Sequence, residues 1–192
     1  MHTGFQKINK SKVNQINKIR NKIVLVLLVP VILVLHGFGN PVGTDESAVK
    51  AMFIYNFTKY FDWSPIESKP EFVIAVYGKS TVAGFLDEIA HRKTINGKPI
   101  VIKTVASFKE IEGSQMLFIP GTVTHINETI QMSLEYSSLI IITESTDALK
   151  SGSHINLINV DGKLRFQLNE KQMKNNSIKF SRELSALSIK KD

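Results

Sequence analysis

One segment carries residues of the types that phosphate chemistry requires. Gly78, Lys79, Ser80 and Thr81 match the end of a phosphate-binding P-loop, and they follow an apolar run as that motif does. The motif also needs a glycine five positions before Gly78, and Val73 stands there. The segment therefore predicts a helix cap, with Ser80 or Thr81 as the capping residue and, at most, a small anion bound at the helix N-terminus.

The histidines and neighbouring acids after residue 43 do not form a catalytic or metal-binding pattern. His91, His125 and His154 are widely separated and lack the i, i+4 spacing of a metalloprotease helix. Close acids occur at positions 87 and 88 and at 110 and 112, where a solvated face is the ordinary interpretation. The chain has neither a G-x-S-x-G nor a G-x-G-x-x-G motif. We therefore expect no catalytic residues, no metal, no cofactor and no enzymatic activity.

A polar set late in the chain has two interpretations. Arg165, Gln167 and Asn169 alternate with apolar residues, so in a strand their side chains share one face. That face is either a solvated side that ends at Asn169, or a contact surface on which Arg165 anchors a partner or pairs with a buried acid. We predict partner binding by this set and by Ile178 and Phe180 in the terminal segment, because an antiparallel edge and an amphipathic helix are readily shared with another chain.

The first 43 residues have the composition of an export signal. A stretch with six cations and no acids precedes an apolar run at residues 23–35, and Gly37-Phe38-Gly39 provides small residues before a cleavage point at Asn40. A membrane span needs about 20 apolar residues, and this run is shorter and contains Pro30, so an uncleaved anchor is the less favoured alternative. We predict a signal peptide at 1–43 and one domain at 44–192.

Removal of this leader changes the charge. The chain has 24 basic and 17 acidic residues, and six of the basic ones lie in the leader, so 18 and 17 remain. A net charge near +1 without a dense cationic cluster argues against nucleic-acid binding. There is no cysteine, which excludes disulfides and thiol chemistry and leaves packing as the source of stability.

An aromatic helix is expected at residues 45–61. Its apolar residues recur at helical spacing, Thr44 and Ser47 are N-cap candidates, and Trp63-Ser64-Pro65 provides the stop. Covering a sheet is the favoured role for these aromatic side chains, ahead of ligand stacking.

Short apolar runs and amphipathic segments alternate in the rest of the chain. Strands are expected at residues 72–77, 100–105, 116–119 and 138–143, and helices after Ser80 and at 124–136. Residues 153–160 and 163–169 flank Asp161-Gly162, which favours a hairpin, and short helices are expected at 171–175 and 181–189. The fold class is therefore α/β: a single domain with a mostly parallel central sheet flanked by helices and a C-terminal antiparallel hairpin.

Several segments, in order, resemble the YfiR-like family (DUF4154) of bacterial periplasmic regulatory proteins. The aromatic helix with its Trp-Pro-like end resembles the family's first helix. The segments that match later features of the family are 72–78, 97–100, 117–119, 162–169 and 181–188. The resemblance covers residues 45–189.

The resemblance implies a role in binding. Proteins of this family are similar to a periplasmic inhibitor that holds down a membrane-bound diguanylate cyclase through its periplasmic sensor region, restraining cyclic-di-GMP signalling and biofilm formation. An outer-membrane-associated partner can sequester the inhibitor, and a homodimer is expected. Well-studied members carry cysteine pairs, which this chain lacks, so thiol redox is not its cue. The alternative function is a periplasmic sensor module that binds a small ligand in a cleft.

Overall fold

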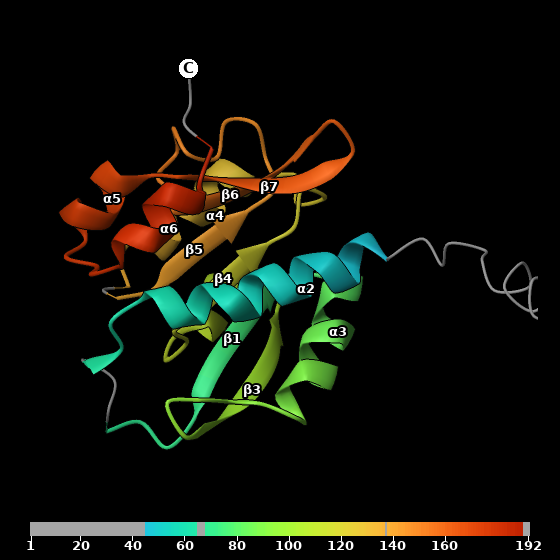
Figure 1. Ribbon diagram of the computed structural model, residues 1–192, viewed down its shortest axis with the longest axis vertical. Coiled ribbons are helices and arrows are strands. Elements are labelled where there is room, and N and C mark those ends of the chain that lie inside the picture. The colour runs from blue at the N-terminus through green and yellow to red at the C-terminus, as the bar shows by residue number, and fades with distance from the viewer. Residues whose placement is uncertain (1–44, 65–67, 137, 190–192) are drawn as a thin grey trace, which may run out of the picture. The chain divides into compact units, whose positions relative to one another are not determined.

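Seven strands form one mixed sheet in the computed structural model, which describes residues 45–64, 68–136 and 138–189. Residues 44–192 form one compact unit, and the predicted export signal at 1–43 lies outside the described residues. The strand order is β2-β3-β1-β4-β5-β6-β7 (Figure 1). The strands are β1 (Phe72–Tyr77), β2 (Thr94–Ile95), β3 (Lys98–Val105), β4 (Met116–Ile119), β5 (Ile140–Thr143), β6 (Ile155–Val160) and β7 (Lys163–Leu168).

The middle of the sheet is parallel and its edges are antiparallel. Strands β3, β1, β4, β5 and β6 run in one direction, whereas β2 pairs antiparallel with β3 and β7 pairs antiparallel with β6. The parallel strands have the order of a flavodoxin-like doubly wound sheet. The expected α/β class, the mostly parallel sheet and the C-terminal hairpin are all confirmed.

Helices connect the strands and cover the sheet (Figure 1). They are α2 (Glu46–Phe57), α3 (Thr81–Ala90), α4 (Ile126–Ser133), α5 (Glu170–Asn175) and α6 (Arg182–Leu187), with short 3-10 helices η1 (Thr58–Tyr60) and η3 (Phe108–Ile111). The two buried clusters show which helix lies on which face. Residues of α2, α3, α5 and α6 pack on one face, and residues of η3 and α4 pack on the other.

The strand alternation divides the core between these two faces. In β4, Met116 and Phe118 belong to the cluster under α2, while Leu117 and Ile119 belong to the cluster under α4. All four side chains are fully buried. A strand that is covered on both faces has no polar side, and this is why the central strands read as unbroken apolar runs.

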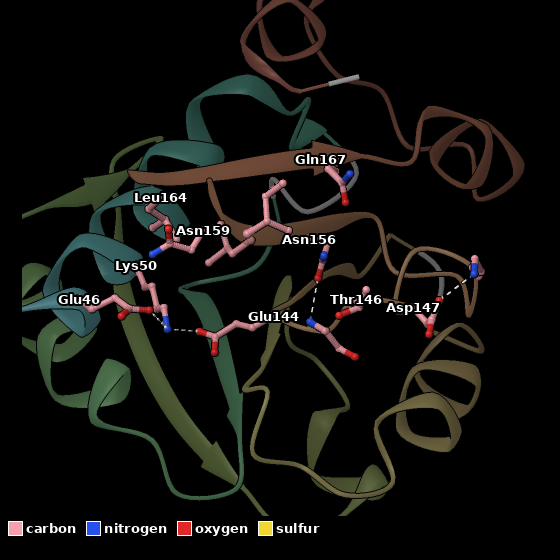
Figure 2. Close-up of a pocket in the computed structure, with 13 residues that line it drawn as sticks. Glu46, Lys50, Glu144, Thr146, Asp147, Asn156, Asn159, Leu164 and Gln167 are labelled. Carbon is pink, nitrogen blue, oxygen red and sulfur yellow. Dashed lines mark hydrogen bonds and ion pairs between the residues drawn. The ribbon is translucent and has the colours of Figure 1, made fainter. Parts of the chain in front are cut away.

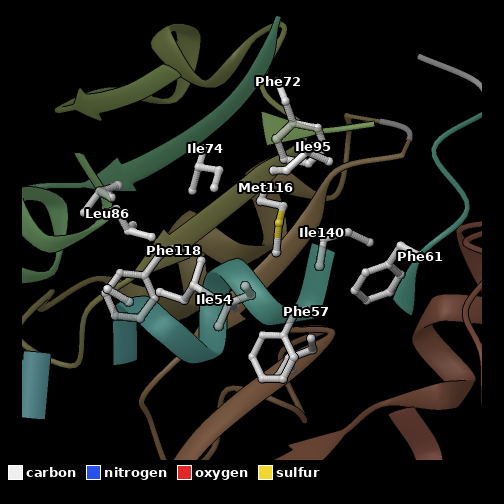
Figure 3. Close-up of a cluster of buried hydrophobic side chains, with 14 of the residues drawn as sticks. Ile54, Phe57, Phe61, Phe72, Ile74, Leu86, Ile95, Met116, Phe118 and Ile140 are labelled. Carbon is white, nitrogen blue, oxygen red and sulfur yellow. The ribbon is translucent and has the colours of Figure 1, made fainter. Parts of the chain in front are cut away.

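The aromatic residues of α2 cover the sheet, as expected (Figure 3). Phe57 packs edge-on against Phe166 of β7 with ring centroids 4.9 Å apart, and Trp63 packs edge-on against Phe72 at 4.7 Å. The Trp63 Nε1–H donates to the Thr58 carbonyl oxygen at 2.7 Å. The large apolar surface of these rings is therefore buried while the one polar atom of the indole is paired.

Two tight turns need backbone in the left-handed region. Asn96 and Gly97 join β2 to β3 with φ of 50° and 76°, and Asp161 and Gly162 join β6 to β7 with φ of 51° and 73°. Positive φ at both central residues is the requirement of the type I′ hairpin turn, and it matches the twist of the strands. The predicted hairpin at Asp161-Gly162 is confirmed.

Several expected boundaries were wrong at the ends of helices. The first helix ends at Phe57 and continues as η1, and Asp45 caps it by accepting the Ser47 N–H at 2.8 Å; Thr44 lies outside the described residues. The expected helix at 124–136 covers only Ile126–Ser133, and the one at 181–189 covers only Arg182–Leu187. Leu187, the last residue of α6, is 58% exposed.

Boundaries of the strands also differ in small ways. The strand expected at 138–143 begins at Ile140, and the strand expected at 100–105 begins at Lys98 because β2, which was not expected, pairs with its first residues. Ile178 and Phe180 pack against the core cluster under α2, and both side chains are partly buried.

Candidate functional site

A polar cleft of about 640 Å³ opens beyond the carboxyl end of β5. Strand β6 pairs with β5 only through Ile155 and Asn156, so the rest of the β6–β7 hairpin extends past β5 and forms one wall. The N-terminal half of α2 forms another (Figure 2). The lining residues are Glu46, Lys50, Glu144, Ser145, Thr146, Asp147, Lys150, Asn156, Leu157, Ile158, Asn159, Leu164 and Gln167.

Lys50 links α2 to the end of β5. Its Nζ lies 2.7 Å from Glu46 Oε1 and 3.0 Å from Glu144 Oε1 (Figure 2). Burial lowers the pKa of Lys50, but the hydrogen bonds and negative charges of Glu46 and Glu144 outweigh that effect, and the pKa is raised. The other Glu144 oxygen, Oε2, accepts the Gly121 N–H at 3.3 Å, so this carboxylate connects the segments that follow β4 and β5.

Asn156 lines the cleft, and the oxygen of its side-chain amide is hydrogen-bonded. Its Oδ1 accepts from the Ser145 N–H and the Thr143 hydroxyl, both at 2.9 Å. The Ser145 N–H can only donate, and this fixes the oxygen of the amide on that side. The Nδ2 group has no hydrogen-bond partner in the described part of the chain, although the residue is only 1% exposed.

Three carboxylates and two lysines line the cleft, and each lysine is paired with at least one of these carboxylates. Lys50 is held between two carboxylates, and Lys150 Nζ lies 2.8 Å from Asp147 Oδ1. Figure 2 shows Asp147 on the side of the cleft opposite Lys50. Gln167 and Asn159 lie on the hairpin wall, where the partly exposed amides offer both donors and acceptors. The cleft therefore presents paired charges and uncharged polar groups and has no excess of cations.

A second, smaller hollow is mostly apolar. It has a volume of about 210 Å³ and lies between α2, β7 and α6. Arg165 and Leu187, both exposed, are at its edge, and Phe53, Phe57 and Phe166 contribute rings to it. The full lining is Phe53, Asn56, Phe57, Tyr60, Arg165, Phe166, Leu184 and Leu187. We call this the α2–β7–α6 groove.

The structure separates the residues that the sequence grouped for partner binding. Arg165 lines the α2–β7–α6 groove and forms no ion pair with any described residue, whereas Gln167 lines the polar cleft. Asn169 caps α5: its Oδ1 accepts the Gln172 N–H at 3.1 Å and its Nδ2 donates to the Leu149 carbonyl oxygen at 2.9 Å. The partner-binding role of these residues stays a prediction.

Ile178 and Phe180 lie in a segment that closes the end of the fold. Phe180 forms an antiparallel bridge with Phe61, and the Asp62 N–H donates to the Lys179 carbonyl oxygen at 3.1 Å. Ile178 lines a small hollow of about 140 Å³ beside Phe61 and Lys179. Partner contact by this segment also stays a prediction.

The segment GKST at 78–81 and the histidines take structural positions. Ser80 caps α3 by accepting the Val82 N–H at 3.3 Å, as predicted. His91 and His125 are exposed, while His154 is fully buried just before β6 and its Nδ1 accepts the Ile141 N–H at 3.0 Å. Burial lowers the pKa of His154 to about 4, so the ring is neutral in the native protein.

The sequence offered a ligand cleft as an alternative but predicted neither its position nor its lining. Lys50 belongs to α2, Glu144 follows β5 and Asn156 lies in β6, and none of the three lies in a recognisable motif. The one available signal was Asn156 between the apolar residues Ile155 and Leu157 of β6, because a polar residue at a buried strand position requires hydrogen-bond partners.

The described residues contain no group of three or more His, Asp or Glu side chains placed to hold a metal ion. Within the same ranges, no helix has both the length and the apolar character needed to cross a bilayer.

The fold and these surfaces place the protein in the class of α/β proteins with a doubly wound, mostly parallel sheet and an open cleft at its carboxyl edge. Within this class the chain belongs to the YfiR/HmsC-like family, DUF4154, whose model matches residues 47–188. The family resemblance stated from the sequence is thereby confirmed. A search of the curated proteins found no match to the chain.

Proposed function

We propose that the chain is a periplasmic regulatory protein that inhibits a membrane-bound diguanylate cyclase, or a related membrane sensor, by direct contact with its periplasmic region. Inhibition of this kind restrains cyclic-di-GMP signalling and biofilm formation. The observation that carries the proposal is the match of residues 47–188 to the YfiR/HmsC-like family. The composition of residues 1–43 supports export to the periplasm.

The α2–β7–α6 groove supports a specific contact surface. Arg165 lies at its edge without an ion-pair partner among the described residues, next to exposed Leu187 and the partly buried ring of Phe53. An arginine beside an apolar hollow suits a partner segment that presents a large apolar side chain next to a carboxylate. Arg165 is therefore the main proposed contact residue, with Gln167, Asn169, Ile178 and Phe180 as proposed further contacts.

Two other interactions complete the proposal. The inhibitor forms a homodimer, and an outer-membrane-associated protein sequesters it to release the cyclase. Both come from the family resemblance. A cue other than thiol oxidation must control the release of the cyclase, since the chain contains no cysteine.

Cellular cyclic-di-GMP tests the proposed role without knowledge of the partner. We expect its concentration to rise when the gene is deleted and to return when the complete chain is supplied. A chain that lacks residues 1–43 should not restore it, because it would remain on the wrong side of the membrane. No change on deletion, or full rescue by the leaderless chain, would refute a periplasmic brake on a cyclase.

Arg165→Ala tests the contact surface. We expect this substitution to weaken capture of the cyclase periplasmic region while leaving the melting temperature nearly unchanged, because the side chain is exposed and has no ion-pair partner within the described residues. Arg92→Ala, which removes another exposed arginine near the end of α3, is the matched control. Unchanged capture together with a large loss of stability would show that Arg165 is structural.

A further inference from the structure

We propose that the polar cleft binds a small neutral molecule rich in hydroxyl groups, of the size of a monosaccharide or disaccharide. The cleft lies at the carboxyl edge of a mostly parallel sheet, where open α/β sheets bind their ligands. Its volume of about 640 Å³ falls within the range of small-molecule sites. This proposal is independent of the regulatory role proposed above.

The unpaired amide of Asn156 is the observation that points to a ligand. A buried donor without an acceptor destabilises the folded state, and native proteins rarely leave one unexplained. The Nδ2 group of Asn156 is such a donor, and the residue lines the floor of the cleft. Figure 2 shows Asn156 between the Lys50–Glu144 side and the Asp147 side of the cleft. The Nδ2 atom is closed to solvent in the ligand-free structure, so a ligand oxygen would supply the missing acceptor once the side chain turns this group toward the cleft.

The charges of the cleft favour a neutral ligand. Lys50 is occupied by Glu46 and Glu144, and Lys150 is paired with Asp147. An anion would have to compete with these carboxylates for the ammonium groups, and a cation would have to compete with the lysines for the carboxylates. A molecule without net charge displaces neither ion pair.

The uncharged groups of the cleft favour hydroxyls on that ligand. Gln167 and Asn159 carry amides, and Ser145 and Thr146 carry hydroxyl groups; each of these side chains can both donate and accept. A hydroxyl group has the same double capacity, so a polyhydroxylated ligand can pair with all of them. Among the described residues the lining contains no aromatic ring, and Leu157, Ile158 and Leu164 supply the apolar wall that the C–H faces of a sugar would contact.

Binding of defined sugars to the purified complete chain tests the proposal. Glucose, N-acetylglucosamine and maltose are titrated separately and followed by isothermal calorimetry, with glycine and inorganic phosphate as the zwitterionic and anionic probes. We expect saturable binding of at least one sugar at millimolar concentration or below. Absence of saturable binding by all three sugars, or binding of only glycine or phosphate, would overturn the proposal.

Two variants locate the binding site. Asn156→Asp keeps the shape of the side chain and an oxygen for the Ser145 N–H but replaces the Nδ2 donor, and we expect it to weaken binding at least about tenfold, equivalent to about 1.4 kcal/mol. Gln167→Ala removes a half-exposed amide from the hairpin wall and provides a second test if the first variant does not fold. Asn175→Ala, which removes an exposed amide at the end of α5, is the control. Wild-type affinity in folded Gln167→Ala, or in folded Asn156→Asp, would place the sugar elsewhere and overturn the assignment.

Discussion

The buried His154 makes the stability of the protein depend on pH between about 7 and 4. Its side chain is fully buried, its Nδ1 accepts the Ile141 N–H, and its Nε2 has no partner among the described residues. Burial alone lowers the pKa of the ring from 6.5 to about 4. As the pH falls below 6.5 the unfolded chain binds a proton that the native protein cannot accept until about pH 4, so the free energy of unfolding decreases across this window.

The size of the effect follows from the pKa shift of His154. The whole window from pH 6.5 to about 4 corresponds to about 3 kcal/mol, and the part between pH 7.5 and pH 5 corresponds to about 2 kcal/mol. Domains are stable by only about 5–15 kcal/mol, so the loss is a large fraction of the total. Above pH 7 the contribution of His154 is complete and constant.

Urea unfolding of the wild type and of His154→Asn at pH 7.5, 6, 5 and 4.5 measures this contribution. Asparagine retains an oxygen that can accept the Ile141 N–H but does not titrate in this range, so the variant is expected to lose about 2 kcal/mol less than the wild type between pH 7.5 and 5. Hydrogen bonds also lower the pKa values of Asp62, Glu110 and Glu183, but these carboxylates are common to both proteins and cancel in the comparison. Parallel pH profiles for the two proteins would refute the argument.

Two further predictions concern positions where the backbone is constrained. Gly152→Ala should lower the free energy of unfolding by about 1–3 kcal/mol, since φ is +104° and an added Cβ would lie 2.6 Å from Leu134 Cδ1. Chemical denaturation measures it, and an unchanged midpoint would mean that the backbone relaxes there. Asn169→Ala should cost about 1–2 kcal/mol because it removes both the cap of α5 at Gln172 and the bond to the Leu149 carbonyl oxygen. Asn169→Asp retains the cap but not that second bond, and the cost should therefore fall between those of Asn169→Ala and the wild type.

The sequence was sufficient where local chemistry decides the structure. The run at residues 72–77 forms β1 with the expected ends. Asp161 and Gly162 form the hairpin turn because this turn requires positive φ at both central positions, and both residues adopt it. Ser80 caps α3 because a serine before an apolar helical stripe can satisfy the first free N–H groups.

The remaining features depend on distant parts of the chain. Leu184 is buried and Leu187 is exposed, although both have the spacing of one helical face. Which of them reaches the core depends on how α6 packs, and the spacing of apolar residues does not specify it. The polar cleft needs the β6–β7 hairpin to extend beyond β5 and Lys50 to reach Glu144, and these contacts exist only after the sheet is assembled. Similarly, Arg165 and Gln167 are two residues apart on β7, yet Arg165 lines the α2–β7–α6 groove and Gln167 lines the polar cleft.

The position of Trp63 gives the protein an internal optical reporter. It is the only tryptophan in the chain, it is 6% exposed, and its ring packs on Phe72 close to the end of α2. The other end of this helix carries Lys50 in the wall of the polar cleft, and twelve helical residues span about 18 Å. The fluorescence of Trp63 therefore reports the packing near the C-terminal end of α2, while the N-terminal half of the same helix lines the cleft in which we propose that the ligand binds. A shift in emission on sugar addition would report movement of α2, and emission unchanged at full occupancy would show that the cleft fills without moving it.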